Sequence, residues 1–320
     1  MRIVSLFCGA GGLDLGLIQA GHEIIWANDN DPDAVATYRH NIGKHVVLSD
    51  ITDVPSCDIP VCDVVVGGFP CQGFSQANRL RAPEDVRNTL YTEFLRVVRD
   101  KKPKWFLAEN VRGILSLGGG AVMERIENDF RRAGFRVDKR LLNAASFGVP
   151  QNRHRVIIAG TREDLPPNLD YPFPMPTHDA NQKAGLLFKE GRLLPYLTVG
   201  DALKDIPEPS EDCAIPNHIY SRYKVTDRDF QGHRQTDPKK PSPTILARGN
   251  GKGGVCAMQH PNNHRRMSVR ESASIQTFPL DFQFFGSMTS CYRQVGNAVA
   301  VEFARALGKQ LNALERMASS

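Results

Sequence analysis

The sequence predicts an α/β protein whose parallel sheet is covered by helices on both faces, with a smaller, loop-rich region inserted near the C-terminus. In the first half, apolar runs of strand length alternate with amphipathic helical segments. A glycine-rich turn directly follows the first of these runs, and regular periodicity stops after the last one. With 320 residues and 41% hydrophobic content, the chain is long enough for one large and one small domain.

Six apolar runs have the length of strands. In each run successive positions are apolar, so both faces of the strand are apolar, which is typical of parallel strands buried on both faces. They are residues 2–7, 23–29, 45–51, 62–68, 104–110 and 155–161. Because ligands of such sheets bind at the carboxyl ends of the strands, the residues that follow these runs are the first place to look for a site.

The segments between the strands carry helical periodicity. They are residues 13–21, 32–42, 89–102 and 121–134. Pro32 stands at a first helical turn, and Gly134 stands where a helix C-cap is expected. These helices supply the connections that a parallel sheet needs.

The second half is organised differently. A proline-rich stretch follows the last strand, and helical pattern returns only at 268–276 and 297–317. The final helix is apolar on one face, so we expect it to pack back onto the first-half sheet. We predict a large domain from 1–165 plus 290–320 and a small domain from 166–289.

Composition excludes several classes. The seven cysteines are odd in number, widely spread and contain no Cys-x-x-Cys pair, which argues against a disulfide framework or a zinc module, so we expect no metal. No apolar run is as long as a membrane span, and we expect an intracellular protein.

The net charge is +5, yet residues 222–266 alone hold ten Lys or Arg against three Asp, a surplus of 10 − 3 = +7. This stretch is either a phosphate-binding surface or a solvated loop face.

Polar or small residues stand at the end of each of the first five strands. Carboxyl ends of parallel strands share one edge of the sheet, so these residues predict a single crevice. In strand order they are Gly9, Asp29, Asp50, Pro70 with Cys71, and Glu109.

The glycine-rich turn "FCGAGGLDLG" (7–16) favours close approach of a ligand to the backbone and to a helix N-terminus. Asp29, at the end of the next strand, can accept hydrogen bonds from a pair of ribose hydroxyls. Nicotinamide, flavin and S-adenosylmethionine sites share this pattern. A nicotinamide site is disfavoured because the third glycine of Gly-x-Gly-x-x-Gly is replaced by Asp14.

"GGFPCQGFS" (67–75) places Cys71 at a sharp turn after a strand. A thiol exposed in a polar pocket is a nucleophile, although an inert thiol and a Cys-His hydrolase stay open from these residues alone. Glu109 is either a carboxyl poised as an acid or a partly solvated loop carboxylate.

"PQNRHRV" (150–156) alternates three polar residues, Gln151, Arg153 and Arg155, so their side chains point one way. This face suits an anionic or carbonyl-bearing ligand, and a surface salt-bridge ladder is the alternative.

Six motifs in this order resemble the DNA (cytosine-5) methyltransferases of the bacterial or phage restriction-modification type. They are "FCGAGG", "GGFPCQGFS", "AENV", "QNRHR", "RRMSVRESASIQTFP" and "QVGNAV". The resemblance covers roughly residues 1–165 and 265–310 and implies a Rossmann-like, S-adenosylmethionine-dependent sheet with a target-recognition domain inserted near the C-terminus.

The resemblance implies catalytic roles for five residues. Cys71 would attack carbon 6 of a cytosine flipped out of duplex DNA, and Glu109 would hold and protonate ring nitrogen 3. Arg153 would contact the base carbonyl, and Arg155 and Gln151 would support the site or the DNA backbone.

The resemblance also implies a cofactor site for S-adenosyl-L-methionine. Asp29 would bind the ribose and Asp50 and Ile51 would lie near the adenine, while Asn30 stands where many members have an aromatic residue. The implied cofactor-binding set is Phe7, Gly9, Gly11, Leu13, Asp29, Asn30, Asp50, Ile51, Pro70, Asn297 and Val299.

The expected partner is double-stranded DNA, bound by a monomer in the bacterial cytoplasm. The segment 75–88 corresponds to a loop that closes over DNA in the family, and residues 242–254 are expected on the recognition surface. The predicted DNA contacts are Ser75, Arg79, Arg81, Thr244, Arg248 and Lys252. A transfer-RNA cytosine-5 methyltransferase and a non-catalytic DNA-binding protein are the alternatives, and the target sequence is not predicted.

Overall fold

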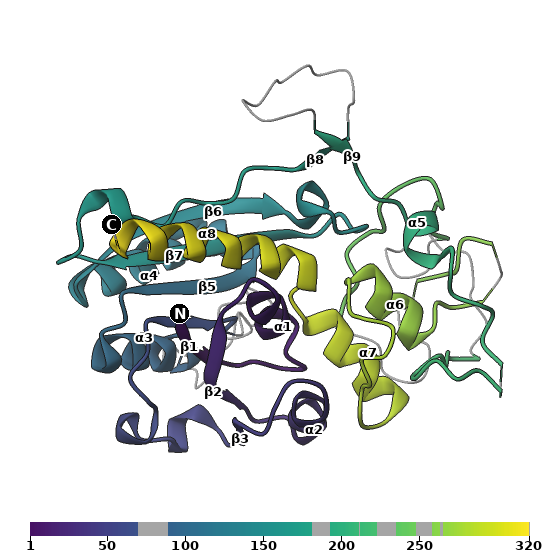
Figure 1. The fold of residues 1–320 in the computed structure, drawn as a ribbon, viewed down its shortest axis with the longest axis horizontal. Coiled ribbons are helices and arrows are strands. Elements are labelled where there is room, and N and C mark those ends of the chain that lie inside the picture. The colour runs from purple at the N-terminus through teal and green to yellow at the C-terminus, as the bar shows by residue number, and fades with distance from the viewer. Residues whose placement is uncertain are drawn as a thin grey trace.

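The fold is a seven-stranded sheet with helices on both faces and a group of three helices beside it (Figure 1). It is seen in a computed structural model, which describes residues 1–69, 89–180, 193–210, 212–222, 235–247, 258–262 and 265–319. The predicted α/β class is confirmed. None of the helices within these ranges is long and apolar enough to cross a membrane.

The strand order of the sheet is β3-β2-β1-β4-β5-β7-β6, and the first five strands are parallel. Their bounds are β1 Arg2–Leu6, β2 Glu23–Asp29, β3 Val46–Leu48, β4 Val64–Gly67, β5 Trp105–Val111, β6 Phe135–Asn143 and β7 His154–Arg162. A further short pair, β8 His178–Asp179 and β9 Leu194–Pro195, lies outside this sheet. The order places β1 and β4 side by side at the centre.

The expectation of a wholly parallel sheet is wrong at one side. β7 runs antiparallel to both β5 and β6, and β6 was not predicted. β6 is the edge strand and only Phe135 in it is buried, so its sequence, "FRVDKRLLN", lacks the continuous apolar run of a central strand. An apolar run such as β7 reveals burial but not direction, because antiparallel strands can be buried on both faces too.

Two apolar layers hold the helices to the sheet. Val64 and Val66 of β4 face one layer and Val65 faces the other, as expected for side chains that alternate along a strand. The first layer contains α1 and α8, and the second contains α3 and α4. The bounds are α1 Gly12–Gln19, α2 Pro32–Asn41, α3 Thr89–Lys101, α4 Ala121–Arg132 and α8 Val301–Ser319.

The final helix packs on the first-half sheet, as the sequence predicts. α8 crosses above the strands and lies against α1 (Figure 1). Glycines permit this close approach, because a Cβ at Gly16 would overlap the Val301 carbonyl oxygen and one at Gly308 would lie 2.7 Å from the Ala20 Cβ. The chain end therefore returns to the start of the sheet.

The helix expected over 297–317 begins later than predicted. α7 (Met288–Asn297) ends where that pattern starts, Ala298 is extended with φ −62° and ψ 146°, and α8 begins at Val301. The Ala298 carbonyl accepts hydrogen bonds from the Arg153 Nη2 and Gln276 Nε2 atoms, at 2.8 and 3.2 Å. Tertiary hydrogen bonds replace the helical ones here, which local periodicity cannot reveal.

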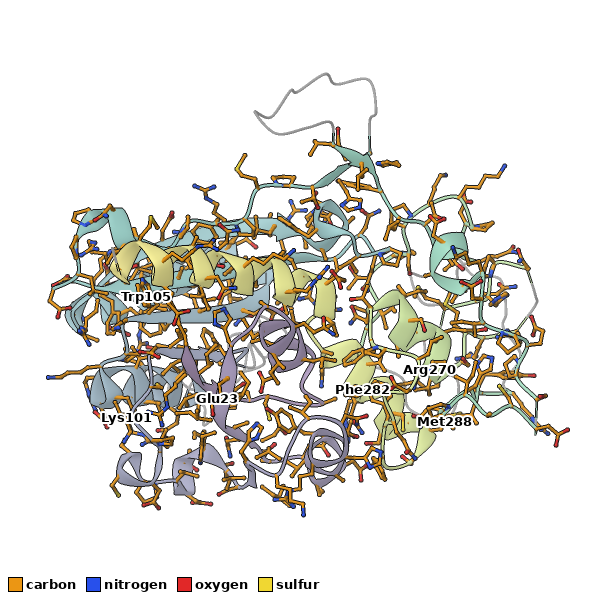
Figure 2. The ribbon with its side chains drawn as sticks, in the orientation of Figure 1. Glu23, Lys101, Trp105, Arg270, Phe282 and Met288 are labelled. Carbon is orange, nitrogen blue, oxygen red and sulfur yellow. The ribbon has the colours of Figure 1, made fainter. Side chains whose placement is uncertain are left out.

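The three helices beside the sheet have a core of their own. They are α5 Val199–Leu203, α6 Val269–Ile275 and α7. Figure 2 shows Arg270 and Phe282 close together in this part of the molecule, far from Trp105 in the sheet. The buried Arg270 guanidinium donates to the carbonyls of Pro216, Pro279 and Phe282, which fixes the loops around α6. The division into domains at 165 and 290 stays a prediction.

Candidate active site

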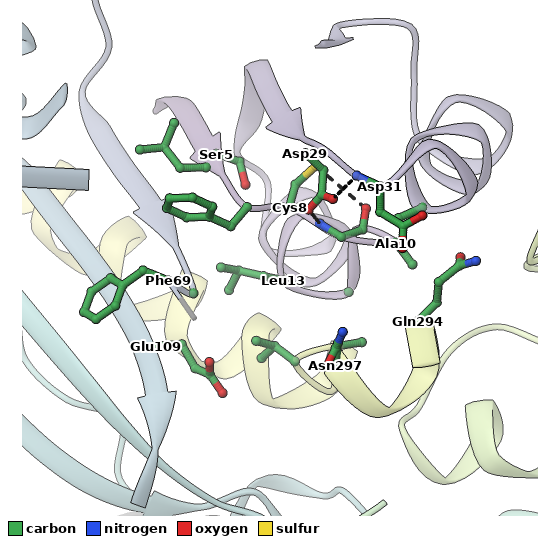
Figure 3. Close-up of a pocket in the computed structure, with 18 of the residues that line it drawn as sticks. Ser5, Cys8, Ala10, Leu13, Asp29, Asp31, Phe69, Glu109, Gln294 and Asn297 are labelled. Atoms are coloured by element: carbon green, nitrogen blue, oxygen red, sulfur yellow. Dashed lines mark hydrogen bonds between the residues drawn. The ribbon is translucent and has the colours of Figure 1, made fainter. Parts of the chain in front are cut away.

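A cavity of about 620 Å³ lies at the carboxyl ends of the parallel strands. Figure 3 shows Cys8 and Asp29 on one side of it and Glu109 and Asn297 on the other. Most of the predicted site residues line it. They are Phe7, Gly9, Leu13, Asp29, Asn30, Asp50, Ile51, Glu109, Arg153, Arg155, Asn297 and Val299. Gly9, Asp29, Asp50 and Glu109, predicted to share one crevice, therefore line one cavity, whereas Pro70 and Cys71 lie outside the described residues.

The backbone of the glycine-rich turn lines part of the cavity. Phe7 and Gly9 have positive φ, 55° and 56°, and the Gly9 N–H donates to Asp29 Oδ2 at 2.8 Å. A Cβ on Gly9 would meet no atom within 4 Å, so this position faces open space. Gly11 does not line the cavity. It caps α1 with φ 87°, and a Cβ there would collide with Ile42, so this glycine serves the turn itself.

Two carboxylates end the neighbouring strands. Asp29 also accepts the Asp31 N–H at 2.9 Å, and burial raises the pKa of its carboxyl above the usual value against the opposing effect of these hydrogen bonds. Asp50 Oδ1 accepts the Thr52 N–H and so caps the turn in which the buried Ile51 lies. Each carboxylate oxygen that holds one amide can accept a further hydrogen bond from a ligand.

Glu109 and Arg155 form an ion pair inside the cavity. The Arg155 Nε atom lies 2.6 Å from Glu109 Oε1, and the two side chains are only 11% and 13% exposed. A Cβ on Gly68 would lie 3.1 Å from the other oxygen, Oε2, so the glycine leaves room for the carboxylate. Arg155 therefore holds one oxygen of Glu109 and leaves the second one near the cavity.

Arg153 is turned toward backbone carbonyls. Its Nη1 donates to Ile245 O at 2.9 Å, and its Nη2 donates to Gly296 O and Ala298 O at 3.0 and 2.8 Å. The Nε atom is buried and has no hydrogen-bond partner among the described residues. Burial, together with the positive charge of Arg155, lowers the pKa of the Arg153 guanidinium to about 9.

Gln151 is fully buried and does not line the cavity. Its Nε2 donates to Gln276 Oε1 at 2.7 Å, and its Oε1 accepts the Ile245 N–H at 2.9 Å. Gln151, Arg153 and Arg155 thus have two different roles. Arg155 pairs with Glu109, whereas Gln151 and Arg153 fix backbone around the end of α7.

Several predicted residues lie outside the described part of the chain. They are Pro70, Cys71, Ser75, Arg79, Arg81, Arg248 and Lys252. Phe69, two residues before Cys71 in the sequence, is buried and lines the cavity, and Asn110 Nδ2 donates to its carbonyl at 3.1 Å. Thr244 is described, and its hydroxyl donates to Asn152 O at 2.7 Å.

The basic stretch 222–266 is less uniform than its charge suggests. Arg266 is 2% exposed, and Arg265 binds Glu208 and Glu271. These two arginines are therefore not part of an exposed phosphate-binding surface, whereas Arg222 and the Lys239–Lys240 pair are exposed.

Sequence reasoning missed part of the lining. Ser5, Cys8, Asp31, Arg293 and Gln294 also face the cavity, and the Arg293 Nη2 atom lies 2.8 Å from Asp31 Oδ2. Arg293 and Gln294 precede Asn297 by four and three residues, a spacing that places them on its face of a helix. That spacing was the available signal. Among the described residues, no group of three His, Cys, Asp or Glu side chains could hold a metal ion.

The family of C-5 cytosine-specific DNA methylases matches residues 1–313. The chain belongs to this family. It is 38% identical to the Type II methyltransferase M.NgoFVII of Neisseria gonorrhoeae, over 97% of this chain and 86% of that protein. It is 35% identical to the Type II methyltransferase M.MthTI of Methanothermobacter thermautotrophicus, over 97% of each. The protein is thus a DNA cytosine-5 methyltransferase of the restriction-modification type, and the predicted family and enzyme class are confirmed.

Solved structures share the fold of this methyltransferase. A DNA modification methyltransferase encoded within an E. coli prophage superposes with a TM-score of 0.73 at 23% identity, covering 99% of both chains. The S. pombe Dnmt2 methyltransferase superposes with a TM-score of 0.70 at 20% identity, covering 100% of both. At these identities the likeness concerns the fold alone.

Proposed function

We propose that this methyltransferase transfers a methyl group from S-adenosylmethionine to carbon 5 of a cytosine flipped out of duplex DNA, through a covalent bond between Cys71 and the base. One observation carries the proposal: the Glu109–Arg155 ion pair opens into the same cavity as the glycine turn and Asp29. An acid for the base and a cradle for a nucleoside cofactor thus share one cavity.

The residues of the cavity fit S-adenosylmethionine. Gly9 presents backbone without a side chain to the open space, and the Asp29 carboxylate stands at the end of β2 with acceptor capacity for ribose hydroxyls. Ile51 supplies a buried apolar surface, and Asn297 brings an amide from α7. When bound, S-adenosylmethionine supplies an electrophilic methyl group on a positively charged sulfur.

The chain's own residues perform the rest of the chemistry. The Cys71 thiolate forms a bond to carbon 6, and Glu109 delivers a proton to ring nitrogen 3, so the electron pair of the 5,6 double bond becomes available at carbon 5. After carbon 5 has taken the methyl group, it loses its proton to a base, the electron pair of that C–H bond restores the 5,6 double bond, and Cys71 leaves carbon 6 as a thiolate. Ring nitrogen 3 returns its proton to Glu109, so the ring regains its aromaticity and the carboxyl is restored. Glu109 Oε2, the oxygen that Arg155 Nε does not hold, is the group we assign to nitrogen 3.

We assign the base carbonyl to Arg155 rather than to Arg153, where the sequence analysis placed it. Arg153 already donates from both terminal nitrogens to three carbonyls. Arg155 uses Nε for Glu109 and Nη1 for the His154 carbonyl, and its Nη2, which has no hydrogen-bond partner within the described part of the chain, is the donor we assign to the base carbonyl. In this assignment Arg153 and Gln151 are positioning residues.

The base must leave the helix to reach this cavity, because ring atoms stacked inside a duplex are not accessible to side chains. The exposed cations Arg222, Lys239 and Lys240 are suited to the phosphate backbone, together with the predicted contacts Arg79 and Arg81. If this role is correct, affinity for DNA falls steeply as salt concentration rises.

Bisulfite sequencing of host DNA after expression tests the reaction and identifies the target at once. We expect protected cytosines at one recurring sequence with the wild-type protein and none with Cys71→Ala, while Cys71→Ala keeps its affinity for duplex DNA. Methylation by Cys71→Ala would overturn the assignment of the nucleophile.

A further inference from the structure

Asn41, at the end of helix α2, binds the backbone of the segment that precedes α7. The Asn41 side chain donates from Nδ2 to the Gln283 carbonyl and accepts the Gln283 N–H at Oδ1, both at 2.8 Å. An amide side chain paired in this way with both polar groups of one residue fixes the position and orientation of that residue. The irregular segment before α7 is therefore attached to helix α2.

Thr37, one turn earlier on α2, closes a ring of hydrogen bonds with the same region. Its hydroxyl accepts the Phe285 N–H at 2.9 Å and donates to Gln294 Oε1 at 2.7 Å. Gln294 Nε2 then donates to the Phe285 carbonyl at 2.8 Å. Thr37 and Gln294 are both almost completely buried, so the bond between them is shielded from water, and the two bonds to the Phe285 backbone are partly buried.

This ring sets the place of one wall of the cavity. Gln294 and Asn297 lie three residues apart on α7 and both face the cavity (Figure 3), whereas Thr37 and Asn41 do not line it. The ion pair between Asp31, the N-cap of α2, and Arg293 of α7 adds a second direct link between these two helices, beside the bond from Thr37 to Gln294. A shift of α7 away from α2 would move Asn297 and Val299 away from the ends of β1 and β2.

We propose that Thr37 and Asn41 are positioning residues that set the affinity for S-adenosylmethionine by fixing the α7 wall. The inference rests on the proposed function, since it requires that this cavity holds the cofactor. Loss of the Thr37 hydroxyl leaves the partly buried Phe285 N–H and the buried Gln294 amide oxygen without this partner, and α7 must move or admit water to satisfy them.

The test uses Thr37→Val, which removes the hydroxyl at nearly constant volume. We expect its dissociation constant for S-adenosylmethionine, measured by equilibrium dialysis without DNA, to rise about tenfold. We expect KM for the cofactor to rise equally, with kcat at saturating cofactor and KM for DNA changed by less than about twofold. Thr37→Ser keeps the hydroxyl and should restore the affinity.

Tyr171→Phe is the matched control. The buried Tyr171 hydroxyl donates to Leu307 O at 2.9 Å, and this residue does not line the cavity, so the variant loses a comparable buried bond elsewhere. It should lose thermal stability and keep cofactor affinity. If Thr37→Val behaves in the same way, the positioning role is overturned.

Asn41→Ala provides a second route should Thr37→Val fail to fold, because Asn41 is half-buried and its loss removes only the two bonds to the Gln283 backbone and one bond from Nδ2 to the Thr37 carbonyl. Weaker cofactor binding with unchanged KM for DNA supports the inference, and wild-type affinity contradicts it. A wild-type protein that binds no S-adenosylmethionine would overturn the proposed function, whereas equal binding by wild type and both variants would overturn the positioning role alone.

Discussion

The two walls of the cavity are held in different ways. The strand wall, formed by the ends of β1, β2 and β5, is fixed by the hydrogen bonds of the parallel sheet and by a backbone turn. The helix wall, formed by Arg293 to Val299, is fixed by side chains that bind backbone, among them Arg153 and Gln276. The side chains of the strand wall therefore stand on a backbone that the sheet holds in place, while the position of the helix wall depends on a few buried polar residues.

The largest expected effect is chemical and belongs to the strand wall. Glu109→Gln keeps the shape of the side chain but cannot deliver a proton, so kcat should fall by about 10²- to 10⁴-fold. Because neither the glycine turn nor α7 changes, affinity for S-adenosylmethionine should stay at the wild-type value. Single-turnover kinetics with saturating cofactor and DNA measures the loss, and an active variant would remove Glu109 from the mechanism.

Arg153→Met should destabilise the helix wall. The Ile245 and Gly296 carbonyls lose the donor that Arg153 supplies and the Ala298 carbonyl keeps only Gln276, so the free energy of unfolding should fall by about 3 kcal/mol or more. Arg155→Met is the matched variant two residues away, where a single ion pair with Glu109 is lost, so it should reduce activity with a smaller loss of stability. Urea denaturation compares the two, and equal losses would contradict the division of roles.

A buried polar cluster joins β1, which contributes to the strand wall, to helices α1 and α2, and its titration should make stability depend on pH. Asp14 is fully buried and accepts hydrogen bonds from Ser5 and Tyr38, and burial raises the pKa of its carboxyl to about 6 from 3.8. The folded state then binds the proton more tightly than the unfolded state. This contribution to stability is complete below the unfolded pKa and is lost as pH rises through the folded one.

Relative to Asp14→Asn, the wild-type protein should lose about 3 kcal/mol of unfolding free energy as pH rises from about 3 to about 7, most of it between the unfolded and folded pKa values of this carboxyl. Denaturation at a series of pH values gives the difference between the two proteins. A difference that does not vary with pH would show that Asp14 is ionised or protonated to the same degree in both states.

The smallest effect separates backbone strain from ligand contact. Gly9→Ala and Gly21→Ala each place a Cβ at positive φ, 56° and 97°, with no atom within 4 Å, and each should cost about 1–2 kcal/mol of stability. Only Gly9 faces the cavity, so only Gly9→Ala should also weaken cofactor binding. Equal cofactor affinity in the two variants would indicate that the ligand does not approach this turn.

Sequence reasoning succeeded on the strand wall for a physical reason. Asp29, Asp50 and Glu109 follow apolar runs, and parallel strands bring such residues to one edge whatever the rest of the chain does. It did less well on the helix wall. The bonds from Arg153 to the Gly296 and Ala298 carbonyls join residues more than a hundred positions apart, and no local pattern contains such contacts.

The polar edge strand β6 illustrates the same limit. Its pairing with β7 is set by the sheet and not by its own composition. Val137 is only half-buried and Leu141 is exposed, so the apolar residues of this strand gave too weak a signal.

Covalent trapping tests the central claim most directly. With S-adenosylmethionine and a duplex that carries 5-fluorocytosine at the target position, fluorine cannot leave carbon 5 as a proton does, so the enzyme should remain bonded to the DNA through Cys71. We predict a denaturation-resistant complex by mass spectrometry, with one methyl group added to the base, formed by the wild-type protein and absent with Cys71→Ala. A wild-type enzyme that methylates the normal duplex but forms no such complex would contradict the account.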